Sequence, residues 1–579
     1  MLHYLKRSAA QAIVCLALAA PSASEATDIR QAGPALTEQQ WAEYEANRPK
    51  TIREIQPFRR STRARAPNGM DITLTSLNPG INAWFLVEIR RDAQSRQIDS
   101  YHIELSDPGG SVLSLSDRSA EGEAPALVIS QDGIEKRCAP WSGNPSALER
   151  ASASGLPYAP VCDGLAFVRN EVRGSRTSRE AVAEFLRDNV AFGESIVDLI
   201  KGSFYEDAYM SSGEVVAGTG AGDVATELGR ARLASHPVIR TYFGFKPEGA
   251  GEGIEAGSWY AVTDAPGIYA SAVQPGMIHP DVLNGPGRTH RLDGIERRAD
   301  VYLVGFDLSQ FDLGYEPGSD HPRLGWSSRP RGAGRNRALP GPDGFDRAAP
   351  VVRTGMLSPA LTDRVAATFA GGFKRDHGAW RAGDKSVTNH GHHYGFVANG
   401  VIFSKLHPGL STLFVLDDGS VHMRKWREED RALLKRVRFA RQNGVPLIED
   451  GVPGAQVTSW LGGNWSGSAE AELRTLRGGA CMKTVGGRKF LIYGYFSTAT
   501  PSAMARTFQA YGCDHAMLLD MNSQEHTYMA LYVREDGTLR PQHLVEGMAQ
   551  IDDRARDGTP VPRFVGYADN RDFIYLLRK

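Results

Sequence analysis

The chain has 579 residues, 41% of them hydrophobic, and is therefore long enough for two or three domains with apolar cores. Lysine and arginine (66) balance aspartate and glutamate (67), so the formal net charge is -1. This balance gives no electrostatic reason to expect nucleic acid or an anionic membrane surface as a partner.

The first 26 residues have the pattern of a cleavable secretory signal peptide. Lys6 and Arg7 form a positive start, and residues 9–20 form an apolar run too short for a membrane-spanning helix. Pro21 and the small residues after it supply a cleavage region. A buried N-terminal helix is the alternative. No later stretch is apolar enough to cross a membrane, so we expect a secreted or periplasmic protein without a transmembrane segment after cleavage.

Cysteine usage agrees with export. Loss of the signal peptide would remove Cys15 and leave four of the 5 cysteines. Four cysteines in an oxidising compartment allow three pairings. We expect Cys138–Cys162 and Cys481–Cys513, because each pair lies within one candidate domain. Four buried free thiols are the alternative, and the spacing matches no zinc pattern.

A polar leader over residues 27–66 precedes a β-rich domain over residues 67–175. Apolar alternation or apolar runs predict strands in this domain at residues 72–77, 84–89, 101–105 and 112–115. Residues 176–255 are predicted to form a connector with helices near residues 178–190 and 195–204 and a glycine-rich loop. That loop lacks the glycine at position 223 and the preceding strand that a dinucleotide-binding fingerprint requires.

The C-terminal part, residues 256–579, combines strands, hairpins and a helix. Thr500 as N-cap and Pro501 at the first helical position begin a helix that stops at Gly512. A strand follows, with Asp520 at its end. Further strands are predicted at residues 301–308, 366–373, 394–397, 401–403, 413–416, 421–423, 490–495 and 527–533, with hairpin turns at Asn399-Gly400 and Asp418-Gly419. This order predicts an α+β fold class, with an antiparallel or mixed sheet and helices behind a small β-rich domain and a helical connector.

Several short motifs of residues 256–579 follow one another in a recognisable order. They are Phe369-Ala370-Gly371-Gly372-Phe373, the two hairpin turns, Arg474-Thr475, a strand, a helix and Leu519-Asp520. This order resembles the phosphodiester glycosidase family, to which phosphodiester α-N-acetylglucosaminidase belongs. The resemblance implies a glycosidase domain in this part of the chain and covers nothing before residue 256.

Two departures from the family pattern concern the expected site. Ala370 stands where the family has Asn, and Met521-Asn522-Ser523-Gln524-Glu525-His526 replaces a glycine-rich run. The glycines of the family let the backbone come close to a ligand, whereas this chain offers side chains there. The departures fit either a different substrate or a loss of activity.

The residues around Asp520 suit glycosyl transfer. Asp520 and Glu525 offer two carboxylates, one as acid or base and the other as nucleophile or stabiliser, with His526 beside them. Arg474 is expected to bind a phosphate in a bidentate manner, and Lys374 to add a point charge. The alternatives are a turn-capping carboxylate for Asp520, a solvated loop for Glu525 and His526, and a surface ion pair for Arg474. Other substrate-binding candidates are Thr475, Gly371, Gly372, His392, His393 and Asn522.

The segment Asn389-His390-Gly391-His392-His393-Tyr394 concentrates histidine. Three histidines so close together suit a transition metal, with Asp376 or Asp384 nearby. A polar active-site loop and a merely polar loop are the alternatives. We expect no cofactor, and a metal at His390–His393 stays an open possibility.

The sequence therefore predicts an exported hydrolase that cleaves a sugar-1-phosphate diester or a related glycosidic bond in envelope or extracellular glycans. The rival hypothesis is a non-catalytic glycan-binding or envelope-assembly protein that retains the fold. Convergence of Asp520, Glu525, Arg474 and the His390–His393 loop in one cleft would favour the enzyme, because catalytic groups must reach the same sugar.

Overall fold

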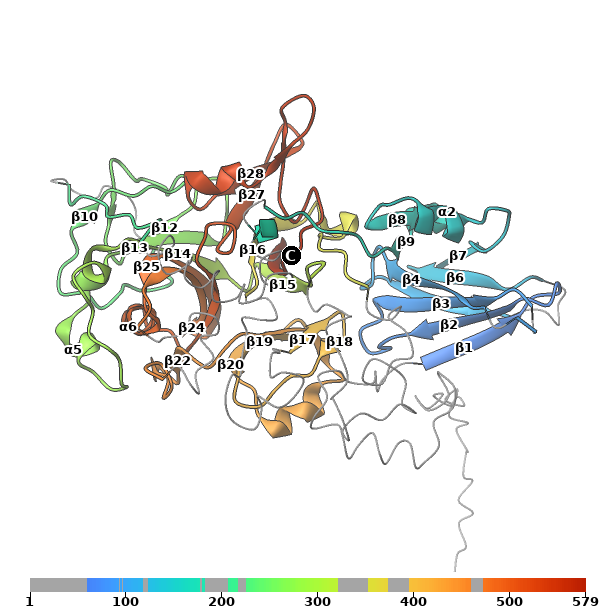
Figure 1. The fold of residues 1–579 in the computed structure, drawn as a ribbon, viewed down its shortest axis with the longest axis horizontal. Helices are drawn as coiled ribbons and strands as arrows, with labels where there is room; N and C mark the ends of the chain where they lie inside the picture. The colour runs from blue at the N-terminus through green and yellow to red at the C-terminus, as the bar shows by residue number, and fades with distance from the viewer. Residues whose placement is uncertain are drawn as a thin grey trace, which may run out of the picture.

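The computed structural model describes residues 60–92, 94–95, 97–117, 123–177, 180–182, 207–216, 225–320, 352–372, 395–459 and 472–579. The predicted signal peptide and most of the predicted connector helices lie outside these residues. The described chain forms an N-terminal β domain and a larger C-terminal part (Figure 1). None of the described helices combines the length and the apolar character that crossing a bilayer demands.

The N-terminal domain is built from two antiparallel sheets and one helix. All four strands predicted in this domain are present. The first strand lies within the range 27–66 that we assigned to the leader, so the sheet begins before residue 67. The six-stranded sheet has the order β1 (Arg60–Arg65), β2 (Asp71–Ser76), β3 (Trp84–Arg90), β4 (Asp99–Leu105), β9 (Ala166–Arg169), β8 (Tyr158–Val161). The second sheet contains β5 (Ser111–Ser116), β6 (Ala126–Gln131) and β7 (Ile134–Cys138), and the helix is α2 (Ala147–Ala153).

Three antiparallel sheets form the C-terminal part. The largest has the order β12 (Tyr260–Ala261), β13 (Ile268–Val273), β14 (Val301–Asp307), β25 (Arg488–Ala499), β24 (Thr475–Val485), β26 (His515–Met521), β22 (Ile448–Glu449), β23 (Val452–Pro453). The second has the order β15 (Phe311–Glu316), β31 (Phe573–Arg578), β16 (Val365–Ala370), β27 (Met529–Glu535), β28 (Thr538–His543). The third has the order β18 (Val401–Ser404), β17 (Phe396–Ala398), β21 (Val437–Gln442), β19 (Ser411–Leu416), β20 (Val421–Lys425).

The small remaining elements connect these sheets. Two short strand pairs are β10 (Val238–Ile239) with β11 (Ile254–Glu255), and β29 (Asp553–Arg554) with β30 (Pro560–Val561). The described α-helices of this part are α5 (Pro280–Leu283) and α6 (Pro501–Ala510).

The prediction of an α+β fold class is wrong, because the described chain is mostly β. Strands β15, β21, β24 and β31 were not predicted, and each adds to a sheet. The residues of β24 and β31 are covered on both faces over most of their length, so apolar and polar residues do not alternate along these two strands, whereas β15 (FDLGYE) does alternate. A pattern search for half-buried strands therefore passes over β24 and β31.

Helix α6 begins and ends as predicted. The Thr500 side chain accepts a hydrogen bond from the Ala503 backbone N–H at 3.2 Å, and Pro501 occupies the first turn. Gly512 follows the helix with a φ of 72°, the left-handed conformation that favours glycine. Met504 and Phe508 are fully buried within the large apolar core of the C-terminal part.

Both predicted disulfides are confirmed. Cys138 and Cys162 join β7 to the turn after β8, and Cys481 and Cys513 join β24 to the turn before β26. The second bridge is fully buried in the core, whereas the cysteines of the first are partly exposed.

A buried ion pair joins the two parts of the chain. Arg169, the last residue of β9, contacts Glu316 at the end of β15 and lies 3.2 Å from Glu104 of β4. Its guanidinium stacks over Trp84, 3.6 Å from the ring centroid. Burial raises the pKa of Glu316 to about 7, although Arg169 opposes the shift. Because loss of either partner would leave a charge buried and unpaired, this contact fixes the β domain against the second sheet.

Candidate functional site

Strand ends from the three C-terminal sheets meet at one place. Asp520 lies at the end of β26, and Gly371 follows the end of β16. β16 pairs with β31 so that Ala370 lies opposite Phe573, which brings Asp572 to the same end as the glycines. Asn443, after β21, donates from its amide to the backbone oxygens of Leu518 (2.7 Å) and Leu519 (3.1 Å) in β26.

Asp520 is held by Arg571 in a buried ion pair. One carboxylate oxygen accepts a hydrogen bond from Arg571 Nη1, and the other accepts from the Met521 backbone N–H at 2.8 Å. Arg571 donates through Nη2 to the Glu180 carboxylate at 2.9 Å. Burial raises the pKa of Asp520 to about 6, and the charge of Arg571 opposes that shift. This carboxyl group can therefore exchange a proton in the mildly acidic range.

A second buried ion pair lies beside the first. Arg441 Nε donates to Asp572 Oδ2 at 2.6 Å, and their side chains are 1% and 0% exposed. The Arg441 guanidinium also covers the Phe396 ring, 4.5 Å from its centroid. The Asp572 charge contributes to raising the pKa of Asp520, whereas Arg441 lowers it. The two pairs thus form one electrostatic unit.

The predicted glycines Gly371 and Gly372 pack directly on this second pair. A Cβ atom on Gly371 would lie 2.6 Å from Asp572 Oδ2. A Cβ atom on Gly372 would lie 2.8 Å from Asn443 Oδ1 and 2.9 Å from Arg441 Nη2, and its φ of 151° also disfavours a side chain. Glycine is required here because the backbone approaches the buried charges so closely.

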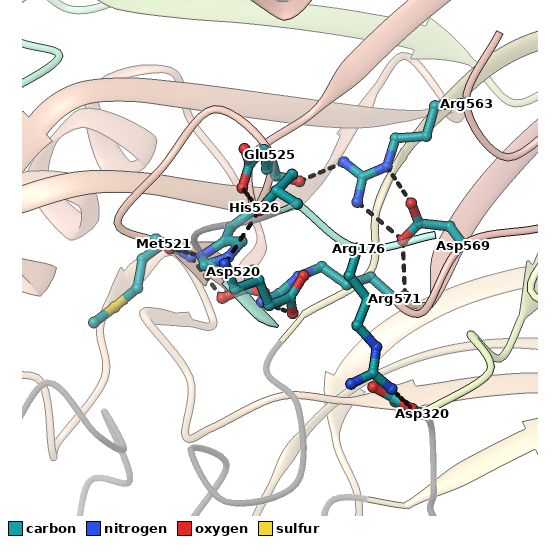
Figure 2. Close-up of polar contacts among 11 residues, drawn as sticks. Arg176, Asp320, Asp520, Met521, Glu525, His526, Arg563, Asp569 and Arg571 are labelled. Carbon is teal, nitrogen blue, oxygen red and sulfur yellow. Dashed lines mark hydrogen bonds and ion pairs between the residues drawn. The ribbon is translucent and has the colours of Figure 1, made fainter. Parts of the chain in front are cut away.

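A third ion pair connects Arg571 with the loop after β26 (Figure 2). Asp569 accepts from Arg563 Nε (2.8 Å) and Nη2 (3.0 Å) and from the Arg571 backbone N–H (2.8 Å). Arg563 also donates to the Glu525 backbone oxygen at 2.5 Å. His526 bonds through Nδ1 to the Met521 backbone oxygen at 2.7 Å. Glu525 and His526 are therefore connected to the segment around Asp520 through these hydrogen bonds, and each makes a different contact.

The Glu525 carboxylate points to another partner. It accepts a hydrogen bond from the Thr177 hydroxyl at 3.1 Å. The charged neighbour of Asp520 is Arg571 instead, with Glu180 on the far side of that arginine. We define the Asp520 site as the residues of the two central ion pairs with their immediate partners: Asp520, Arg571, Glu180, Arg441, Asp572 and Asn443.

Arg474 is bound by carboxylates. Its Nε and Nη2 donate to the two oxygens of Asp207 at 3.0 and 2.8 Å, and Nη1 donates to Asp293. This arrangement corresponds to the ion-pair alternative for Arg474. The guanidinium nitrogens that we expected to bind a phosphate instead donate to protein carboxylates.

Thr475 and Asn522 contact each other. The Thr475 hydroxyl donates to Asn522 Oδ1 at 3.1 Å, and the Asn522 backbone N–H donates to the Leu476 oxygen at 2.8 Å. Asn522 has a φ of 81°, so the backbone is left-handed where the family has glycines, and asparagine tolerates that conformation. These two residues tie the loop to β24.

Lys374, His392 and His393 lie outside the described residues, as does the whole His390–His393 loop. Among the residues that the structure does describe, there is no group of three or more His, Cys, Asp or Glu side chains arranged to hold a metal ion.

Sequence reasoning missed most of the charged partners. The run Asp569-Asn570-Arg571-Asp572 directly precedes the last strand, and its alternation of acidic and basic residues was the available signal. Arg441 lies near the end of a strand that was itself not predicted, and Asn443 directly follows that strand. Arg571, Asp572 and Arg441 act on the pKa of Asp520 from segments that are far from it in the sequence.

Several polar atoms next to the ion pairs have no hydrogen-bond partner. They are both amide atoms of Asn570, Nε of Arg571 and the hydroxyl of Ser523. The three residues are 1%, 4% and 6% exposed. Buried polar atoms of native proteins are normally satisfied by protein, water or ligand, so each of these atoms has unused hydrogen-bonding capacity.

No family model and no curated protein matches this chain. Among solved structures, one match is the catalytic domain of zebrafish N-acetylglucosamine-1-phosphodiester alpha-N-acetylglucosaminidase, auto-inhibited by its pro-peptide, with a TM-score of 0.29 and 10% identity over 55% of this chain and 85% of that chain. Another is a hypothetical protein from Synechocystis, with a TM-score of 0.24 and 10% identity over 86% of this chain and 97% of that chain. Both likenesses are too distant to carry a conclusion about this chain.

Proposed function

We propose that the protein is an exported hydrolase of a glycosidic bond, that its substrate is a sugar-phosphate diester of envelope or extracellular glycans, and that Asp520 transfers the proton. The observation that carries the proposal is the environment of Asp520. Its carboxyl group is buried against Arg571, and burial raises its pKa to about 6. A carboxyl group whose pKa lies near the working pH serves as both acid and base.

Asp572 is the second carboxylate in this proposal. Glycosyl transfer commonly uses two carboxyl groups whose pKa values are pushed apart. Asp572 is paired with Arg441, and its charge raises the pKa of Asp520. This assignment replaces Glu525, whose carboxylate accepts from Thr177.

The unpartnered polar atoms support a sugar-phosphate as the substrate class. A sugar offers hydroxyl groups that both donate and accept, which suits the free amide of Asn570. A phosphodiester offers acceptor oxygens, which suit the free Nε of Arg571 and the Ser523 hydroxyl.

Two observations support export. The two disulfides are bonds that form and persist in oxidising compartments. Residues 1–26 have the composition of a signal peptide, which independently predicts the same compartment.

The test is a turnover assay on purified protein with a panel of sugar-phosphate diesters and uncharged glycosides. Asp520→Asn should remain folded and lose activity by roughly 10²-fold or more. Asp363→Asn is the matched control, because that side chain is 92% exposed. A folded Asp520→Asn variant with undiminished turnover would contradict the catalytic role. Wild type that binds a glycan but turns over no substrate of the panel would favour the glycan-binding rival.

A further inference from the structure

The chain that leaves the β domain lies against the Asp520 site. We call its described residues 174–177 and 180, which follow β9 in the chain, the strap. Ser175 donates from its backbone N–H to the Ala568 oxygen at 2.8 Å, and its own oxygen accepts from the Asn570 N–H at 3.2 Å. Gly174 N–H donates to the Ser319 hydroxyl at 2.9 Å. The strap thus pairs with the chain just ahead of Arg571.

The approach between these two backbones is close. A Cβ atom on Gly174 would lie 2.3 Å from the Asp569 carbonyl carbon and 2.4 Å from the Asn570 nitrogen. No side chain fits at that position without moving one of the two segments. The strap is therefore packed on the backbone that carries the ion-paired residues of the site.

Three side chains of the strap reach charged or polar groups of the C-terminal part. Figure 2 shows Arg176 with Asp320, a contact of 3.1 Å from Nη2 to Oδ1. Thr177 donates to the Glu525 carboxylate at 3.1 Å. Glu180 accepts from Arg571 Nη2 at 2.9 Å, on the arginine that also binds Asp520.

We propose that the strap is a positioning element of the Asp520 site and that Glu180 acts by sharing Arg571 with Asp520. This inference rests on the proposed function for its catalytic meaning. It gives the N-terminal domain a role, because that domain holds the start of the strap through the buried contact of Arg169 with Glu104 and Glu316.

The physical reason is the geometry of the guanidinium. Its two terminal nitrogens point to different carboxylates, so Glu180 fixes the plane in which Arg571 presents Nη1 to Asp520. Glu180 also neutralises part of the positive charge that favours the ionised form of Asp520. Glu180 is thus a positioning residue, since it reaches Asp520 only through Arg571.

The groups other than Arg571 that act on the pKa of Asp520, or lie near it, come from several elements. They are Asp572 before β31, Arg441 of β21, the Met521 N–H and the nearby Tyr493 of β25. Asp572 and Arg441 bind each other, so their charges largely cancel. Arg571 shares its positive charge between Asp520 and Glu180. Its effect on the pKa of Asp520 is therefore the one that a substitution of Glu180 is expected to change.

The experiment uses the full chain and the variant Glu180→Gln. The midpoint of Asp520 titration is obtained from the pH dependence of the difference in unfolding free energy between each protein and its Asp520→Asn derivative. We expect this midpoint to fall by about half a pH unit or more in Glu180→Gln, because an undivided cation favours the carboxylate. The control Glu252→Gln, at a side chain that is 83% exposed, should leave the midpoint unchanged.

Two outcomes overturn the inference: an unchanged midpoint in Glu180→Gln, or an equal shift in Glu252→Gln. If Glu180→Gln does not fold, Glu180→Asp replaces it, since the shorter carboxylate holds Arg571 less well and should give a smaller shift in the same direction. No substrate is needed for this readout. A lack of turnover on every substrate would therefore count against the proposed function and leave this inference standing.

Discussion

Asp520 and Arg571 form a buried ion pair, although 51 residues separate them in the chain. The pair joins the end of β26, in the largest sheet, to the residues just before β31, in the second sheet. Arg571 reaches a third part of the structure through Glu180. A single guanidinium therefore connects two sheets with the chain that comes from the N-terminal domain.

The first prediction concerns the stability of the protein as a function of pH. Burial raises the pKa of Asp520 from 3.8 to about 6, so the folded protein binds this proton more tightly than the unfolded chain. Ionising Asp520 therefore destabilises the fold as pH rises from about 4 to about 6, by roughly 3 kcal/mol in total. The Asp520→Asn variant lacks this titratable carboxyl group, so its stability should not show this pH-dependent loss.

Urea unfolding of wild type and Asp520→Asn at several pH values measures this difference. The free energy of unfolding of the Asn variant minus that of wild type should increase as pH rises through this window. Above the window this difference should stay constant. A difference that stays constant with pH would show that Asp520 titrates in the folded state as it does in the unfolded chain.

The second prediction concerns Arg474. Its guanidinium binds Asp207 and Asp293, so Arg474→Ala leaves two carboxylates without their cation. We expect the free energy of unfolding to fall by about 1–3 kcal/mol. Turnover of charged and uncharged substrates should fall by the same factor.

Chemical unfolding and parallel kinetics on both substrate classes test this. Arg427→Ala is the matched control, because that side chain is 65% exposed and lies 3.8 Å from its partner Glu429. A loss confined to phosphodiester turnover would support Arg474 as the phosphate ligand expected from the sequence.

The third prediction concerns Gly371. The added methyl group of Gly371→Ala would lie 2.6 Å from Asp572 Oδ2, so Asp572 must move away from Arg441. We expect lower activity together with a loss of about 1–3 kcal/mol in stability, as for other overpacked positions. The matched control is Gly251→Ala, where the added Cβ meets nothing within 4 Å. A stable Gly371→Ala variant with full activity would contradict the proposed role of Asp572 in the reaction.

The fourth prediction concerns the disulfides. The bridges span 24 and 32 residues, for which the loop-entropy model gives about 3–4 kcal/mol each. Replacing Cys481 and Cys513 by alanine should lower the melting temperature more than replacing Cys138 and Cys162, because the first pair is also part of the core. Peptide mapping without reductant should find both bridges, and alkylation of all four thiols in the native protein would contradict them.

The sequence by itself determined the features that depend on neighbouring residues. Helix α6 follows from Thr500 and Pro501 at its start and Gly512 after its end, since capping is a local interaction. Strands β2 to β5 follow from apolar patterns, and the cysteine pairs follow from each lying in one domain. The position of Asp520 at a strand end was predictable for the same local reason.

Only the tertiary structure decided which groups surround Asp520. Arg441, Arg571 and Asp572 are charged residues in or beside strands, and a sequence pattern assigns such residues to the solvent. They are buried because strand ends from three sheets meet and each charge finds an opposite one there. Strands that are covered on both faces, such as β24 and β31, lack the alternation by which a strand is recognised, and the described chain is mostly β instead of α+β. Arg474 shows the converse: its motif was visible in the sequence, but Asp207 and Asp293, brought to it by folding, decided what it binds.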